Sequence, residues 1–250
     1  MAITLVISGC CGRMGQAIAR AALQDSAFAI GAALEAPGHE AVGRDLGTVL
    51  GRPAALGVAV SDDADAALSR GDVLIEFTLP EVTAAHAQLA QQRRKPMVIG
   101  TTGLSDAEQG VIREAAKSIP IVFSPNMSVG VNVLFELVRL AAIRLSGDDV
   151  EVVETHHKQK KDAPSGTAKR LADILASARG QHPEAIPVHA IRAGDIVGDH
   201  TVVFAGPSER LEITHRAQSR DVFALGALRA AQFVVTQLPG LYEMLDVLKA

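Results

Sequence analysis

The amino-acid sequence predicts an α/β protein: a parallel-sheet domain followed by a second, α+β region. Two observations predict the parallel sheet. Short apolar runs alternate with helical patterns up to residue 127, and a glycine-rich loop directly follows the first run. A third observation predicts the second region, because three strand-like runs between residues 188 and 217 have no helical pattern between them. The change near residue 127 is therefore a change of architecture.

Six apolar runs predict the strands of the parallel sheet, because short apolar runs bounded by turn residues typically form buried strands. The runs are residues 3–9, 28–35, 57–62, 72–78, 96–103 and 120–126. Helical patterns separate several of them, and one begins with Ser105-Asp-Ala-Glu108, the pattern of a capping box. This βαβ rhythm predicts helices on both faces of the sheet.

The second region begins with a long, mostly apolar helix, predicted at 130–145. A strand at 149–157 and a helix at 165–178 follow. Three runs are then predicted as antiparallel strands, and a last apolar helix and a short tail close the chain. The three strands are residues 188–194, 196–206 and 209–217, and the last helix is residues 221–238.

Composition narrows the class of protein. The chain has 250 residues, 48% of them hydrophobic and 21% charged, which is typical of a packed globular protein with room for two domains. A net charge of −4, no Trp and one Tyr argue against general nucleic-acid binding. No apolar run reaches the roughly 20 residues of a membrane helix. Cys10 and Cys11 are adjacent, so they rarely form a disulfide with each other, and they show no metal-binding spacing. Together with the lack of a membrane-length run, this predicts a soluble, cytoplasmic protein.

The loop after the first strand, Ser-Gly-Cys-Cys-Gly-Arg-Met-Gly, predicts a dinucleotide site. Gly9, Gly12 and Gly15 lie between a strand and a helix, where the backbone can turn tightly and helix amides can face a phosphate. The spacing is GxxGxxG, where the usual fingerprint is GxGxxG. Glu35 ends the second strand, 20 residues after Gly15, where a carboxylate can bind the adenosine ribose hydroxyls.

The residue after Glu35 bears on the choice of cofactor. NADP-binding proteins often place an arginine near this position to meet the 2′-phosphate, whereas this chain has Ala36. Arg13 and Arg44 can still supply positive charge. We therefore predict that NADH is used at least as well as NADPH.

The stretch 154–170, Glu-Thr-His-His-Lys-Gln-Lys-Lys-Asp-Ala-Pro-Ser-Gly-Thr-Ala-Lys-Arg, predicts an anion site. Ser165 is a favoured N-cap residue, and the apolar spacing that follows it is helical. Gly166 and Thr167 then fall in the first turn, where backbone amides attract anions and a glycine allows close approach.

The residues upstream of this helix start add positive charge and a group suited to proton transfer. If the preceding strand continues, His156, Lys158 and Lys160 lie on one side of it. His157 and Lys161 then lie on the other side. Imidazole suits proton transfer near neutral pH. The roles of Lys158 and Lys161 stay open between solvated side chains and substrate contacts.

These motifs resemble the 4-hydroxy-tetrahydrodipicolinate (dihydrodipicolinate) reductase family of lysine and diaminopimelate biosynthesis. The glycine loop is similar to the family's nucleotide loop, and His-His-Lys-Gln-Lys-Lys-Asp-Ala-Pro-Ser-Gly-Thr-Ala matches its signature. The segments 100–103, 124–132, 192–206 and 209–220 fit the same family, so the resemblance covers essentially the entire chain.

The resemblance implies a Rossmann-like dinucleotide-binding domain, residues 1–127 and 221–250, and a substrate-binding and tetramerisation domain, residues 128–220. It implies NADH- or NADPH-dependent reduction of a cyclic dicarboxylate to tetrahydrodipicolinate by a homotetramer. Carried over by position, it makes His156 the general acid/base and Lys160 a proton donor, with His157, Gly166 and Thr167 binding substrate. The implied cofactor-binding residues are Gly9, Cys10, Cys11, Gly12, Arg13, Met14, Glu35, Gly100, Thr101, Thr102, Ser124, Pro125, Asn126 and Met127.

Two other classes of protein compete with this interpretation. A semialdehyde dehydrogenase that forms a thioester needs a cysteine in its catalytic domain, whereas both cysteines here lie in the nucleotide loop. A non-enzymatic, NAD-sensing regulatory module needs no proton donors, so His156 and Lys160 argue against it. The chain departs from the family pattern at two positions. Ala36 and Leu79 stand where some members of the family have a basic residue. These departures argue against a preference for NADPH, and they do not affect the predicted reaction.

Overall fold

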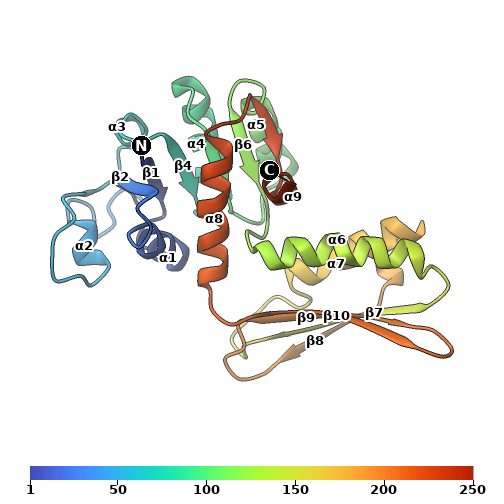
Figure 1. Ribbon diagram of the computed structural model, residues 1–250. Helices are drawn as coiled ribbons and strands as arrows, with labels where there is room; N and C mark the ends of the chain where they lie inside the picture. The colour runs from blue at the N-terminus through green and yellow to red at the C-terminus, as the bar shows by residue number, and fades with distance from the viewer. Residues whose placement is uncertain (250) are drawn as a thin grey trace. The chain divides into compact units, whose positions relative to one another are not determined.

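A computed structural model describes residues 1–249, which divide into two compact units (Figure 1). Unit 1 contains Met1–Met127 together with the segment from Phe223 onward, and unit 2 contains Ser128–Val222. The chain therefore leaves the first unit at the end of its sixth strand and returns to it for its last helices. Within the described range, no helix combines the length and the apolar character needed to cross a bilayer.

Unit 1 is built on a seven-stranded parallel sheet in the order β11-β6-β5-β4-β1-β2-β3. The strand order reverses between β1 and β4, and in such sheets ligands bind beyond the carboxyl ends of the strands at that point. The strands are β1 Ile3–Ser8, β2 Phe28–Leu34, β3 Val60–Ser61, β4 Val73–Glu76, β5 Met97–Ile99, β6 Pro120–Phe123 and β11 Gly240–Tyr242.

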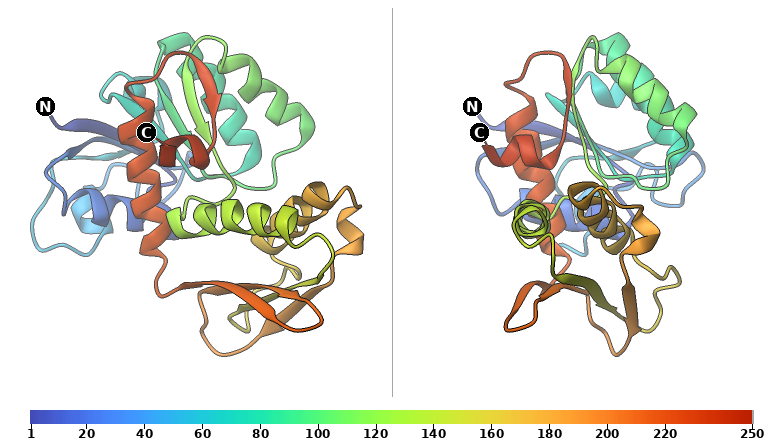
Figure 2. Two further views of the ribbon diagram at one scale, coloured as in Figure 1. Left: turned by 45° about the vertical axis from the view of Figure 1, so that its right-hand side comes forward. Right: turned by 90° about the vertical axis from the view of Figure 1, so that its right-hand side faces the viewer.

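Helices cover both faces of this sheet, as predicted. Figure 2 shows α8 on the face opposite α4 and α5. The capping box of α5 is present, because the Ser105 hydroxyl accepts from the Glu108 amide at 3.3 Å and the Glu108 carboxylate accepts from the Ser105 amide at 2.7 Å. The helices are α1 Arg13–Ala22, α2 Leu46–Val49, α3 Ala64–Leu68, α4 Pro80–Arg93, α5 Asp106–Ala115, α8 Asp221–Val234 and α9 Met244–Lys249.

Four elements of unit 1 have no counterpart in the sequence prediction. The helices α2, α3 and α9 have only four, five and six residues, too few to show a helical period. The strand β11 has three residues and pairs in parallel with β6, so the sheet has seven strands where six were predicted. Such a short run becomes a strand because an edge of the sheet is available to it, a fact that lies outside its own sequence.

Unit 2 is a four-stranded sheet covered on one face by two neighbouring helices (Figure 2). Its core consists of apolar side chains from α6, α7, β7 and β9, among them Leu134, Val152, Leu171 and Phe204. The elements are α6 Val129–Arg144, β7 Asp149–His156, α7 Gly166–Arg179, a short 3₁₀ helix Pro183–Ala185, β8 Val188–Arg192, β9 Gly198–Ala205 and β10 Arg210–Ala217.

The pairing of these strands corrects one prediction. The strands β9 and β10 are antiparallel neighbours, as expected. The strand β8 does not pair with β9: the sheet order is β10-β9-β7-β8, and β8 runs parallel to β7. The reason is that α7 serves as the crossover between β7 and β8, and a crossover helix returns the chain parallel to the first strand. This order places the end of β8 beside the end of β7.

Candidate active site

The glycine loop of unit 1 has the tight geometry that its sequence predicted. Gly9 has φ of +72°, and a side chain there would place Cβ 2.6 Å from the Phe77 carbonyl oxygen. A Cβ at Gly15 would lie 2.1 Å from the Gly9 carbonyl oxygen, so only glycine lets α1 pack directly onto the loop. Gly12 is the N-cap of α1 and offers no side-chain cap. The helix therefore presents backbone amides, not a side chain, at this end.

Glu35 lies beside this loop. Its carboxylate accepts from the Cys11 amide at 3.0 Å through one oxygen and from the Ala36 amide at 3.0 Å through the other. The strands β1 and β2 are neighbours, which brings the two segments together at the same edge of the sheet. Arg13 is exposed and Met14 is partly exposed in the first turn of α1.

The other predicted cofactor residues follow β5 and β6 at that same edge. A Cβ at Gly100 would lie 2.2 Å from the Phe77 ring, so glycine is required there for packing. Thr101 is buried, and its hydroxyl oxygen accepts from the Thr78 amide at 3.2 Å. Thr102 is exposed. Thr101 thus ties the loop after β4 to the loop after β5.

The segment 124–127 follows β6 at this same edge of the sheet. The Ser124 hydroxyl donates to the Asn126 carbonyl oxygen at 2.9 Å, which holds the turn around the exposed Pro125. Met127 is buried, and its carbonyl oxygen would lie 1.7 Å from a Cβ at Gly226 of α8. With the carboxylate of Glu35 and the open helix start of α1, these loops fit a dinucleotide: backbone amides for the phosphates and an acid for the ribose.

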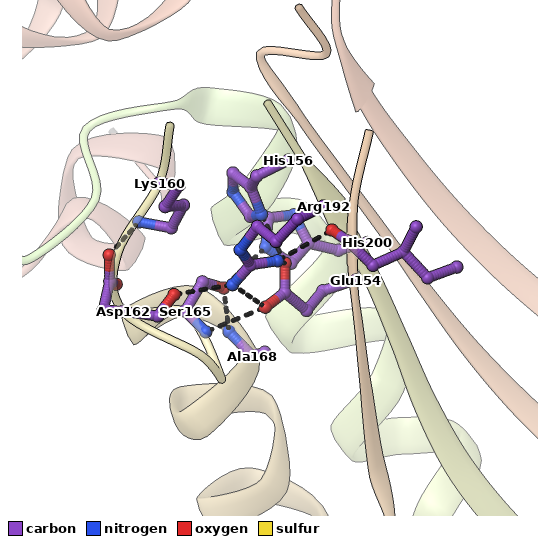
Figure 3. A network of polar contacts seen from close by, with 9 residues as sticks. Glu154, His156, Lys160, Asp162, Ser165, Ala168, Arg192 and His200 are labelled. Atoms are coloured by element: carbon purple, nitrogen blue, oxygen red, sulfur yellow. Dashed lines mark hydrogen bonds and ion pairs between the residues drawn. The ribbon is translucent and has the colours of Figure 1, made fainter. Parts of the chain in front are cut away.

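In unit 2, a buried carboxylate organises the predicted catalytic histidine (Figure 3). Glu154 and His156 lie two residues apart on β7, so both side chains are on the buried face of the strand. Glu154 is fully buried and hydrogen-bonds to His156 Nδ1. It also accepts two hydrogen bonds from Arg192 of β8, at 2.8 and 2.9 Å, and one from the Ser165 amide at 3.0 Å. One carboxylate therefore joins the histidine, an arginine and a helix start.

These contacts decide the charge states of the pair. Burial alone would raise the pKa of Glu154, but hydrogen bonds from Arg192, His156 and Ser165 outweigh it and leave the pKa below its ordinary value. Burial lowers the pKa of His156, and it outweighs the opposing effect of Glu154. The carboxylate therefore stays ionised, and burial favours the neutral form of the His156 imidazole, which can accept a proton.

The start of α7 is capped as predicted. The Ser165 hydroxyl accepts from the Ala168 amide at 3.2 Å and lies 3.2 Å from His200 Nε2. Burial, followed by the charge of His156, lowers the pKa of His200 to about 3, so His200 is neutral. Gly166 is exposed, and a Cβ there would meet nothing within 4 Å. The first turn of the helix is therefore open at Gly166.

The cations after β7 take different positions. The strand ends at His156, and the Lys160 amide donates to the His157 carbonyl oxygen at 3.1 Å, so the chain turns and the side-to-side alternation expected beyond His156 is not present. The Lys160 ammonium is 2.8 Å from Asp162 (Figure 3). Lys158 and Lys161 are exposed, as for solvated lysines.

Both units match models of one protein family. Residues 3–127 match the model for the N-terminus of dihydrodipicolinate reductase, and residues 130–248 match the model for its C-terminus. The chain belongs to the dihydrodipicolinate reductase family.

Relatives of nearly equal length carry the name of the same enzyme. The chain is 46% identical to the 4-hydroxy-tetrahydrodipicolinate reductase of Geobacter metallireducens and 47% identical to that of Geobacter sulfurreducens. Each alignment covers 98% of both chains. The predicted reductase class, with NADH or NADPH as cofactor, is confirmed by the family assignment, and the semialdehyde dehydrogenase and NAD-sensing alternatives find no support.

A solved structure of the family confirms the predicted fold class. Dipicolinate-bound dihydrodipicolinate reductase from Paenisporosarcina superposes with a TM-score of 0.83 at 26% identity, covering 97% of this chain and 98% of that one. A myo-inositol dehydrogenase from Corynebacterium glutamicum reaches 0.63 at 11% identity, covering 96% of this chain and 90% of that one. The second likeness concerns the fold alone.

Three residues of this reductase-family site were not singled out from the sequence: Glu154, Arg192 and His200. Glu154 carried a usable signal, because an acid two residues before a histidine in a strand shares its face. Arg192 and His200 carried none, because their neighbours depend on the order of strands in the sheet.

Proposed function

We propose that this chain reduces 4-hydroxy-tetrahydrodipicolinate to tetrahydrodipicolinate, with His156 as general acid/base and Lys160 as proton donor. The observation that carries the assignment is the buried Glu154–His156 pair next to the capped start of α7. A proton-transfer group and an anion-binding helix start are joined there by one carboxylate. That combination suits a substrate that carries carboxylates and must gain a proton.

The bound NADH or NADPH supplies the hydride. Negative charge then builds on the conjugated ring of the substrate, and the Lys160 ammonium stabilises it and delivers a proton. His156 exchanges its proton at Nε2, because Nδ1 is held by Glu154. We propose that Gly166 and Thr167 bind a substrate carboxylate at the start of α7.

His157 completes the proposed substrate contacts. Its Nδ1 atom is buried and has no hydrogen-bond partner among the described residues. A buried polar atom without a partner is costly and favours a ligand that can supply one. In unit 1 we propose that the cofactor contacts the loop 9–14, Glu35, the loop 100–102 and the segment 124–127.

One assay tests both the reaction and the cofactor. We expect oxidation of NADH when the purified protein is coupled to the synthase that makes the hydroxylated substrate. We expect kcat/KM with NADH to be at least equal to that with NADPH, because Ala36 and the exposed Leu79 offer no positive charge to a 2′-phosphate. Absence of turnover with either cofactor would refute the proposed reaction, and a strong NADPH preference would refute the cofactor prediction alone.

We also propose that the enzyme is a homotetramer that works in the cytoplasm. One apolar surface of unit 2 supports assembly. Val133, Leu137, Leu140 and Ile143 form a stripe along α6, and each of them is 41–52% exposed. Exposed apolar stripes of this kind mark association surfaces. Light scattering is expected to give four times the chain mass of 26.1 kDa; a monomer mass would contradict the proposal.

A further inference from the structure

Two thiols and a carboxylate meet in the loop between β1 and α1. The sulfur atoms of Cys10 and Cys11 are 3.8 Å apart, and both cysteines are free. With a carboxylate oxygen of Glu35, these potential ligand atoms all lie within 4.8 Å of one another. Among the described residues, this is the one group of three or more such side chains close enough to share an ion.

The backbone holds this group in place. The Cys10 amide donates to the Leu34 carbonyl oxygen at 3.0 Å, and the Cys11 amide donates to the Glu35 carboxylate at 3.0 Å. The turn at Gly9, with φ of +72°, ends the alternation of the strand, so the side chains of two successive residues can approach each other. The arrangement is therefore fixed by the same contacts that shape the nucleotide loop.

The spacing suits a tetrahedral metal ion. Zinc binds thiolate sulfur at about 2.3 Å, so two thiolates on one tetrahedral ion lie about 3.8 Å apart. The two sulfur atoms are at that separation without any metal. We propose that Cys10, Cys11 and Glu35 bind one Zn²⁺ ion, with water in the fourth position, and that an occupied site excludes the dinucleotide.

Binding must release protons. Each thiol loses its proton to solvent as its metal–sulfur bond forms, so one Zn²⁺ displaces two protons. Burial raises the pKa of Cys10 and that of Cys11; Glu35 adds to the rise at both thiols, whereas Arg44 lowers the pKa of Cys11. Zinc affinity is therefore expected to increase as pH rises.

Zinc and the dinucleotide exclude each other because both would use the same atoms. This exclusion rests on the proposed cofactor contacts, whereas the proposed metal site does not depend on them. Glu35 cannot give the same oxygen to a zinc ion and to the ribose hydroxyls. A metal held by Cys10 and Cys11 also occupies the loop proposed to face the phosphates. Coupling between two ligands is reciprocal. Zinc must therefore lower the affinity for the dinucleotide by the same factor by which the dinucleotide lowers the affinity for zinc.

Co²⁺ tests the site directly, because it replaces Zn²⁺ and its absorption reports tetrahedral thiolate ligation. We expect one equivalent of Co²⁺ to give a sulfur-to-cobalt charge-transfer band on the purified full-length chain. Cys11→Ser removes one of the two thiolates and should at least halve the intensity of the band, and Glu35→Gln should weaken Co²⁺ binding. Glu40→Gln, at an exposed acid outside the group, should leave the band unchanged. A spectrum without a thiolate band, or a band of undiminished intensity in Cys11→Ser, would overturn the site.

Two further measurements complete the test. In the wild-type protein, Zn²⁺ should protect the partly exposed Cys11 thiol from iodoacetamide, which keeps the proposal testable if a variant fails to fold. Alkylation of Cys11 at an unchanged rate at saturating Zn²⁺ would overturn the site. Fluorescence titration should show that saturating Zn²⁺ raises the apparent Kd for NADH at least about tenfold. Cobalt binding with an unchanged Kd for NADH would overturn the exclusion and the proposed Glu35–ribose contact, but not the metal site.

Discussion

Replacing His156 with glutamine is expected to lower kcat by about 10²–10⁴-fold, the usual contribution of a general acid/base. Glutamine can still hydrogen-bond to Glu154, but it cannot exchange a proton near neutral pH. The affinity for NADH, measured by fluorescence titration, should stay close to that of the wild type, because His156 belongs to unit 2 and the proposed cofactor loops belong to unit 1. Steady-state kinetics at fixed pH measures the loss.

Lys160→Ala should likewise lower kcat and leave the affinity for NADH unchanged. Two neighbouring lysines provide matched controls. Lys158 and Lys161 are exposed lysines within two residues of Lys160, whose side chain is only 23% exposed. Alanine at position 158 or 161 should leave kcat near wild type. Unchanged turnover in both His156→Gln and Lys160→Ala would remove these residues from the mechanism, whereas equal losses in all three lysine variants would indicate a general effect of charge.

Replacing Glu154 with glutamine is expected to cost about 3–5 kcal/mol in the free energy of unfolding, because it removes one partner of a buried ion pair. Glutamine brings an NH₂ group to a site where Arg192, the Ser165 amide and His156 all hydrogen-bond to the carboxylate. Urea unfolding measures the loss. Glu114→Gln is the matched control, because Glu114 pairs with Lys117 on the surface and exposed pairs contribute at most about 1 kcal/mol. Equal losses in the two variants would contradict the prediction.

The pH dependence of kcat/KM shows whether Glu154 positions His156 for proton transfer or has only a structural role. Glu154 raises the pKa of His156 through its hydrogen bond and its charge, in opposition to burial. Removing that charge should lower the pKa of His156 further. The protonated imidazole then disappears at lower pH, so the alkaline fall of kcat/KM that reports His156 should move to lower pH. Glu154→Asp keeps the charge and should retain more of the wild-type profile. An unmoved profile in Glu154→Gln would refute the positioning role.

Local sequence patterns determined most of the secondary structure. The capping box at Ser105 and the N-cap at Ser165 depend on contacts between residues near in sequence, and the structure confirms both. The apolar runs of the parallel sheet are recognisable from their local composition, although the strands pair with residues far away in the chain, and the structure confirms these strands as well. The glycine loop is also a local feature, since φ of +72° at Gly9 and the packing of Gly15 on Gly9 arise within seven residues.

The sequence by itself therefore determined the fold class, the family and the residues whose chemistry is visible in one stretch, above all His156, Lys160 and the start of α7. Only the tertiary structure decided that β8 lies beside β7 and brings Arg192 to Glu154, 38 positions away in the chain. The physical reason is that strand order is set by the crossover helix and the shared core of unit 2. The residues near Arg192 in the sequence do not predict which strand β8 pairs with.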